Sequence, residues 1–273
     1  MIHVICALHV EAAPLIKRFD LKQRAGKFFG HFYYNDMMTL TLSGVGKTSA
    51  AAAVMATLYE FPEVFFRQWL NVGVAGHRTF DLGTRCVSNK VVDAGSGQTW
   101  YPQFVFDANV FSQAMLMTCD SVVHQYPADT LVDMEASGFC SQAMRWSTAE
   151  HVHCFKVVSD NQCVPVNNNK QGALLTDLIV RACDDIETFV SSLCVMSQEG
   201  AATQFEQVVC AFLHRWHFSH YETLELRKQI AAWQAVIGRS AGVDHFAKLQ
   251  TAQEVLQVFK EEIRNFPLDY GAK

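Results

Sequence analysis

Short apolar runs alternate with helical stretches along the first two-thirds of the chain. The runs at residues 2–8, 38–42, 69–75 and 152–158 each end at a glycine turn or at an acidic or polar residue. Helix-forming sequence follows the runs, and this alternation is typical of a sheet covered by helices. The sequence therefore predicts an α/β fold with a central sheet.

The pattern changes near residue 195. A long amphipathic helix is expected at residues 171–195, and beyond it the chain has few glycines, no convincing strand and helical spacing throughout. We expect an α/β domain at residues 1–195 and an all-helical C-terminal extension at residues 196–273.

Composition and charge limit the classes of partner. The chain has 273 residues, of which 50% are hydrophobic, enough for a substantial core. A formal charge of -5 and a pI near 6.1 argue against nucleic acid or an anionic membrane as a partner. No run approaches the roughly 20 apolar residues of a membrane span, and the N-terminus reads as a strand rather than as a signal peptide.

The nine cysteines form no Cys-x-x-Cys pair. An odd count without a pairing pattern indicates free thiols in a reducing compartment. We therefore expect a soluble, cytoplasmic protein.

The stretch SGVGKTSA at residues 43–50 looks like a phosphate-binding loop but lacks its first glycine. A Walker loop needs a glycine five places before Gly46, and Thr41 stands there. The stretch therefore predicts a glycine turn before a helix, with Thr48 or Ser49 capping an alanine-rich run at residues 50–60.

Polar groups follow several of the predicted strands. In open α/β sheets ligands bind beyond the carboxyl ends of the strands, and Glu11, Gly46, Gly73 and Asp160 all fall there. Glu135 stands at the mouth of a predicted helix. Structural alternatives stay open at this point, because an acid in a first helical turn favours the helix dipole and an aspartate after a strand can cap a turn.

Five blocks occur in an order that resembles the nucleoside phosphorylase/nucleosidase superfamily. They are ALHVEAAPL, SGVGKTSAAAAV, NVGVAG, VDMEASGF and KVVSDN, and together they span roughly residues 1–195. The chain is most similar to the methylthioadenosine/S-adenosylhomocysteine nucleosidases. The resemblance implies a mixed central sheet flanked by helices, as in the nucleoside phosphorylases, and a small-molecule nucleoside as substrate.

The resemblance also implies roles for individual residues. Glu11 matches the carboxylate that activates the attacking water, and Asp160 matches the acid that delivers a proton toward N7 of the purine. Met134 and Glu135 match the pair that contacts the ribose. Gly46 belongs to the glycine turn near the ribose and the nucleophile.

Two positions depart from the family pattern. Val74, which follows Gly73 in NVGVAG, stands where members usually carry a serine, so it cannot hydrogen-bond the ribose or the nucleophile. Val122 or Val123 replaces the aromatic residue that normally packs against the purine. The resemblance still places Gly73, Val74 and Val122 at the substrate.

Elementary chemistry agrees with these roles. Cleavage of an N-glycosidic bond builds positive charge on the ribose and negative charge on the departing base, so carboxylates near the sugar and an acid at the base both help. The acid has to hold a proton, which a closed apolar pocket favours. By the family pattern an aspartate at position 160 suits a 6-aminopurine, although Asn161, the residue type of the 6-oxopurine enzymes, is adjacent.

Two points have alternatives: which molecule is the nucleophile, and whether the protein is an enzyme at all. Phosphorylases bind a dianion, and relatives place an arginine near the block where this chain has Asn71, so we expect water as nucleophile and a phosphorylase as the alternative. A non-catalytic nucleoside-binding or scaffold protein is the third possibility, since Val74 and Val122 alter the site.

We expect no cofactor and no metal. His214, His217 and His220 recur at three-residue spacing in the helical extension, but no Cys or carboxylate set stands beside them at ligand spacing. The family habit of pairing implies a homodimer.

Overall fold

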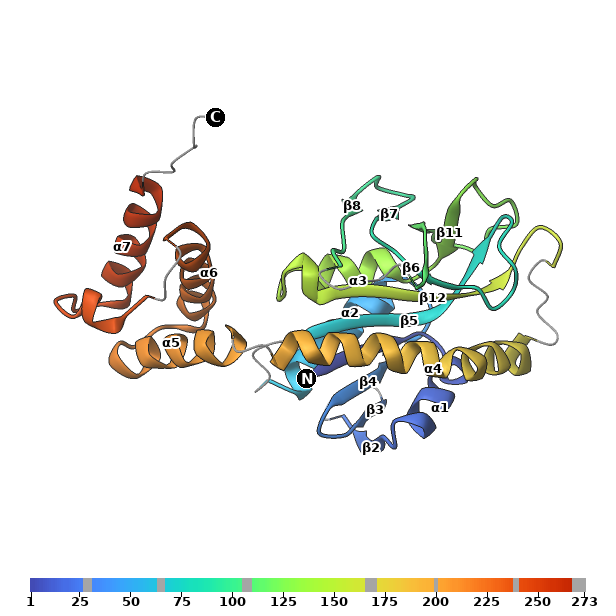
Figure 1. Cartoon of the computed structure of the whole chain (residues 1–273), viewed down its shortest axis with the longest axis horizontal. Helices are drawn as coiled ribbons and strands as arrows, with labels where there is room; N and C mark the ends of the chain where they lie inside the picture. The colour runs from blue at the N-terminus through green and yellow to red at the C-terminus, as the bar shows by residue number, and fades with distance from the viewer. Residues whose placement is uncertain are drawn as a thin grey trace. The chain divides into compact units, whose positions relative to one another are not determined.

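The computed structural model describes residues 1–26, 31–62, 67–104, 110–164, 171–198, 201–237 and 241–266 (Figure 1). Contacts divide the chain into two compact units, Met1–Ser197 and Gln198–Lys273. The boundary expected at residue 195 falls inside the long helix α4 (Gln171–Gln198).

A mixed sheet forms the centre of the first unit, which confirms the predicted α/β fold (Figure 1). Its principal path runs in the order β2-β3-β4-β1-β5-β11-β10-β7-β8, and β12, β6 and β9 branch from β5. The strands are β1 (Ile2–Cys6), β2 (Lys22–Ala25), β3 (His31–Tyr34), β4 (Met38–Leu42), β5 (Gln68–His77), β6 (Arg85–Val87), β7 (Val91–Asp93), β8 (Thr99–Trp100), β9 (Ser112–Gln113), β10 (Met115–Thr118), β11 (Thr130–Asp133) and β12 (Val152–Asp160).

Strand β5 changes partner along its length. Its first half pairs in parallel with β1, from Gln68 to Asn71, while its far end pairs antiparallel with β11 at Gly76 and His77. Strand β12 runs parallel along the other edge of β5 for nearly its full length. Between Asn71 and Gly76 the first edge of β5 therefore has no strand partner among these pairings, and the candidate site is built there.

Helices cover both faces of this sheet. They are α1 (His9–Arg18), α2 (Lys47–Glu60), α3 (Ala136–Ala143) and α4. Because side chains alternate along a strand, β1 sends Val4 into a core shared with α1 and α4, and it sends Ile5 into a core shared with α2 and α3. The helices thus hold the sheet from two sides and leave its carboxyl edge to the loops.

Two local details differ from the sequence-based expectation. Helix α2 begins at Lys47, and its N-cap is Gly46 without any side-chain cap, so the expected capping by Thr48 or Ser49 is wrong. Gly46 has φ +101°, a left-handed conformation that favours glycine. Asp160 is the last residue of β12 rather than the first residue after it.

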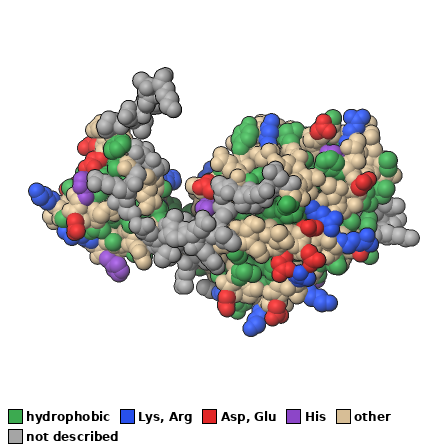
Figure 2. Space-filling model, in the orientation of Figure 1, with side chains coloured by type: hydrophobic (Ala, Val, Ile, Leu, Met, Phe, Trp, Pro, Cys, Tyr) green, Lys and Arg blue, Asp and Glu red, His purple; other side chains and the backbone are tan. Residues whose placement is uncertain are grey.

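The surface of the first unit mixes both signs of charge. Figure 2 shows acidic and basic side chains interspersed on the face that carries α4. Arg18 of α1 pairs with Asp184 and Glu187 of α4, and Arg85 of β6 pairs with Asp185 of α4 at 2.8 Å.

The second unit is entirely helical in its described part. It contains α5 (Ala201–Arg215), α6 (His220–Ile237), the short 3-10 turn η2 (Val243–Phe246) and α7 (Ala252–Asn265). It has its own core, in which Phe212, Trp233, Phe246 and Phe259 pack against one another. Across the described residues of both units, no helix is long and apolar enough to cross a membrane.

Candidate active site

The side chain of Glu11 lies against the part of β5 that β1 no longer pairs with. Strand β1 ends at Cys6 and α1 begins at His9, which places Glu11 in the first turn of α1. Its Oε1 accepts a hydrogen bond from the backbone N–H of Val74 at 3.0 Å, and its Oε2 accepts one from the N–H of Leu8 at 2.9 Å. The side chain is 3% exposed. The carboxylate is therefore fixed against the strand backbone.

Glu135 approaches the same place from α3. Its Oε1 accepts a hydrogen bond from the N–H of Gly46 at 2.9 Å, and the N–H of Met134 lies 3.3 Å from its Oε2. Gly138 makes this approach possible, because a β-carbon there would overlap the backbone of Lys47 at the start of α2. The crossing of α3 over α2 thus brings Glu135 to the glycine turn.

Lys156 of β12 supplies the charge between these carboxylates. Its Nζ lies 2.9 Å from Oδ2 of Asp133, and both side chains are at most 1% exposed. Gly73 leaves the space that Glu11 and Lys156 share: a β-carbon there would lie 3.1 Å from Oε1 of Glu11 and 3.6 Å from Nζ of Lys156. Glu11, Asp133 and Glu135 therefore surround one buried ammonium group.

Burial dominates the electrostatics of this cluster. It raises the pKa of Glu11 above the ordinary glutamate value, against the backbone N–H donors and Lys156, which lower it. Burial also raises the pKa of Glu135, and the attraction of Lys156 opposes that shift. Burial alone lowers the pKa of Lys156, but the nearby carboxylates outweigh it and leave the pKa raised. Lys156 is thus charged, and both glutamates are easier to protonate than glutamates in water.

Asp160 lies farther along β5, opposite Gly76 in the register of β12 and β5. Gly76 is three residues beyond Gly73, which is roughly 10 Å of strand. The Asp160 carboxylate is 7% exposed and accepts hydrogen bonds from the hydroxyls of Tyr126 and Ser159. Glu11 and Lys156 thus lie beside Gly73, and Asp160 lies beside Gly76, three residues farther along β5.

The neighbouring Asn161 has a structural task. Its Nδ2 donates to the carbonyl of Phe80 at 2.8 Å, and its Oδ1 accepts from the N–H groups of Cys163 and Val164. These bonds hold the turn after β12. Asn161 therefore holds the turn, and the Asp160 side chain takes no part in these bonds.

Of the remaining residues expected at the substrate, Val74, Gly46 and Met134 lie at the cluster. Val74 is partly buried and packs against the α1/α4 core, and Gly46 and Met134 contribute backbone N–H groups to Glu135. Val122 lies in the loop between β10 and β11 and is 51% exposed.

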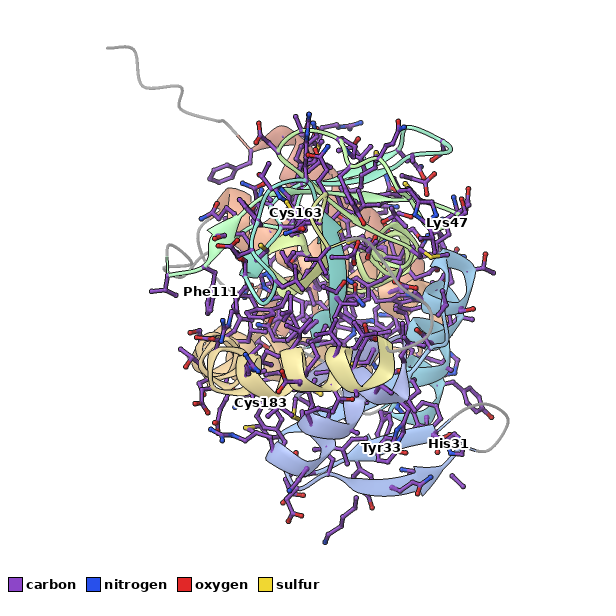
Figure 3. All side chains as sticks on the ribbon, turned by 90° about the vertical axis from the view of Figure 1, so that its right-hand side faces the viewer. His31, Tyr33, Lys47, Phe111, Cys163 and Cys183 are labelled. Carbon is purple, nitrogen blue, oxygen red and sulfur yellow. The ribbon has the colours of Figure 1, made fainter. Side chains whose placement is uncertain are left out.

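Lys47, which directly follows the glycine turn, forms an ion pair with the loop between β10 and β11. Its Nζ lies 2.8 Å from Asp120 in the loop and 3.0 Å from Asp93 of β7. Figure 3 shows Lys47 well away from His31 and Tyr33 of β3. Asp93 also accepts from the hydroxyl of Ser137 in α3 at 2.8 Å, so the loop, the turn and α3 are joined.

Sequence reasoning missed Lys156, Asp133 and Tyr126. A signal existed for Lys156, since a lysine inside the apolar run of residues 152–158 needs a buried partner. Asp133 directly precedes Met134 and could have been proposed as that partner. No local pattern marks Tyr126, because its contact with Asp160 joins residues 34 apart.

The described residues contain no group of three or more His, Cys, Asp or Glu side chains that could hold a metal ion. His214, His217 and His220 of the second unit are among these described residues.

The first unit matches known nucleosidase structures. The 5′-methylthioadenosine/S-adenosylhomocysteine nucleosidase from S. pneumoniae, solved with a transition-state inhibitor, matches at TM-score 0.56 and 18% identity, over 70% of this chain and 99% of that chain. The 5′-methylthioadenosine nucleosidase of Arabidopsis thaliana matches at 0.57 and 17%, over 69% and 95%. The futalosine hydrolase of Helicobacter pylori matches at 0.57 and 14%, over 70% and 97%.

No family model matches the chain, and no curated protein matches it. Helices α5–α7 lie beyond the part that the nucleosidases cover. The structural matches confirm the expected fold: the chain has the α/β fold of the methylthioadenosine/S-adenosylhomocysteine nucleosidases.

Proposed function

We propose that the protein hydrolyses the N-glycosidic bond of an adenosine-like nucleoside and releases the free base. One observation carries the proposal: Glu11 and Glu135 are buried around Lys156 where β1 leaves β5, and Asp160 of β12 stands opposite Gly76, roughly 10 Å of strand beyond Gly73. This spacing suits a ribose at the glutamates and a purine at the aspartate.

The glutamates act on the sugar side. Glu11 takes a proton from a water molecule whose oxygen then bonds to C1′ of the ribose. Its raised pKa makes it a better base near neutral pH than an ordinary glutamate, because proton transfer is most efficient when the pKa of the base approaches the working pH. Glu135 accepts hydrogen bonds from the ribose hydroxyls, and both carboxylates stabilise positive charge on the sugar.

Asp160 acts on the base side. When the bond between C1′ and the base breaks, its electron pair stays with the base, and Asp160 delivers a proton to N7. The side chain is buried and its neighbour Asn161 is held by the turn, which supports recognition of a 6-aminopurine by the aspartate. The names of the matched structures include nucleosidases for methylthioadenosine and adenosylhomocysteine, in keeping with this choice.

Water is preferred over phosphate as nucleophile. The cluster holds one ammonium group among three carboxyl groups, and such a surrounding disfavours a dianion. Asn71 stands near the place where the resemblance implies an arginine in phosphorylases. It donates its side-chain N–H to the carbonyl of Ile5 at 3.1 Å and is 1% exposed. Arg85 is engaged by Asp185 of α4.

The test is release of free base by the purified full chain. Methylthioadenosine, adenosylhomocysteine and futalosine are incubated with the protein, with and without inorganic phosphate, and the products are separated by chromatography. We expect adenine from the first two nucleosides at the same rate in both buffers. Base released only with phosphate would show a phosphorylase. No release from any nucleoside, together with a raised melting temperature on nucleoside binding, would show a binding protein.

A further inference from the structure

Both oxygens of the Asp160 carboxylate are occupied by hydroxyl donors. Tyr126 donates to Oδ2, and Ser159, the preceding residue of β12, donates to Oδ1. All three side chains are buried, with exposed fractions of 6–7%. Each carboxyl oxygen keeps a further lone-pair position after these bonds are made, and in the acid form one of these positions carries the proton.

Tyr126 reaches Asp160 across the face of β5. It lies in the loop between β10 and β11, and its ring rests directly on Gly76, where a β-carbon would overlap the ring. The absence of a side chain at Gly76 thus lets the ring lie over the strand. Gly76 is also the register partner of Asp160, so the contact is built from the backbone upward.

The buried hydroxyl of Tyr126 requires a hydrogen-bond partner. A phenylalanine would fill nearly the same buried volume, whereas a buried hydroxyl without a partner costs about 1–3 kcal/mol. Burial, together with the adjacent carboxylate of Asp160, raises the pKa of Tyr126, so the hydroxyl keeps its proton and acts as the donor. Asp160 is its partner.

Two donors on one carboxylate restrict its rotation. With Oδ1 tied to Ser159 and Oδ2 tied to Tyr126, the plane of the Asp160 carboxyl group is fixed, and with it the direction of the proton that its acid form carries. A general acid depends on such fixed geometry, because proton transfer needs the acid within hydrogen-bond reach of the departing atom.

We propose that Tyr126 is a positioning residue that orients the Asp160 carboxyl toward the departing base. The proposal rests on the proposed nucleosidase function. Tyr126 acts through Asp160 on departure of the base, and it contributes little to substrate binding.

The experiment compares two leaving groups. Adenine needs a proton to depart, whereas the nitrophenolate of 4-nitrophenyl β-D-riboside departs without one. The variants are Tyr126→Phe, Asp160→Asn and, as a matched control, Tyr221→Phe, which changes a side chain in α6 that is 76% exposed. Each full-length variant is assayed for kcat and KM on methylthioadenosine and on the nitrophenyl riboside.

We expect Tyr126→Phe to lower kcat on methylthioadenosine about tenfold or more, with KM nearly unchanged, a part of the 100-fold or greater effect expected for Asp160→Asn. Both variants should keep the wild-type rate on the nitrophenyl riboside. Tyr221→Phe should match wild type on both substrates.

Three results overturn the proposal. If Tyr126→Phe matches wild type on methylthioadenosine while Asp160→Asn is inactive, the hydroxyl has no role. Equal losses of Tyr126→Phe on both substrates show general damage to the site. A raised KM with unchanged kcat shows a binding role. Failure of the proposed function looks different, since the wild-type protein itself then releases no adenine, or Asp160→Asn releases it at the wild-type rate.

Discussion

Nζ of Lys156 lies 2.9 Å from Oδ2 of Asp133, and both side chains are almost completely buried. Removal of one partner from a buried ion pair leaves an uncompensated charge, which costs about 3–5 kcal/mol. We therefore predict that Lys156→Met lowers the free energy of unfolding by that amount, measured by urea denaturation.

The double variant Lys156→Met/Asp133→Asn is the control for this prediction. It removes both charges, so it should recover part of the loss, although Asp133 also accepts hydrogen bonds from Thr118 and from the N–H of Ala136. A single variant as stable as wild type, or a double variant less stable than the single one, would contradict the ion-pair account.

The raised pKa of Glu11 predicts a pH dependence. A general base works in its ionised form, so activity falls as the pH drops through the pKa of Glu11, which burial places above the ordinary value of 4.5. The acid side of the profile of kcat/KM against pH should therefore lie above pH 4.5 in the wild-type protein.

Glu11→Gln removes that base and should lower kcat on methylthioadenosine about 100-fold or more. Glu187→Gln on α4 changes a half-exposed glutamate of a surface ion pair and serves as the control, with an expected wild-type rate. A Glu11→Gln variant that keeps the wild-type rate would remove Glu11 from the mechanism.

The sequence predicts the sheet and its flanking helices because apolar runs and helical spacing are local signals. Glu11, Glu135 and Asp160 could be proposed because the resemblance and the strand ends mark them. The cluster around Lys156 could not be assembled in this way, since it depends on where β1 stops pairing with β5 and on how α3 crosses α2.

The start of α2 shows a second limit of sequence reasoning. Thr48 and Ser49 are good capping residues, yet the helix begins before them at Lys47. Gly46 adopts the left-handed conformation and gives its N–H to Glu135, a partner 89 residues away. A tertiary hydrogen bond thus accompanies a helix start that differs from the one local preferences predict.

The crossing of α3 over α2 requires glycine at position 138. A methyl group there would overlap the backbone of Lys47, which cannot move without disturbing the start of α2. We predict that Gly138→Ala lowers the free energy of unfolding by roughly 3 kcal/mol, by overpacking, and also slows base release because Glu135 is displaced.

Gly172→Ala is the matched control for that substitution. Its β-carbon would meet only the side chain of Val10, at an ordinary 3.7 Å, and alanine favours the helix α4. Its urea denaturation midpoint should equal or exceed that of wild type. If Gly138→Ala unfolds at the wild-type urea concentration too, the close crossing is not required.

The most direct test of the central claim follows the oxygen that reaches C1′. The full-length protein is incubated with methylthioadenosine in water enriched in oxygen-18, without phosphate, and the released sugar is analysed by mass spectrometry. The account predicts free adenine and one heavy oxygen at C1′ of the sugar, with label incorporation at the rate of base release. Intact nucleoside in this phosphate-free buffer, with sugar released only after phosphate is added and as the sugar 1-phosphate, would contradict it.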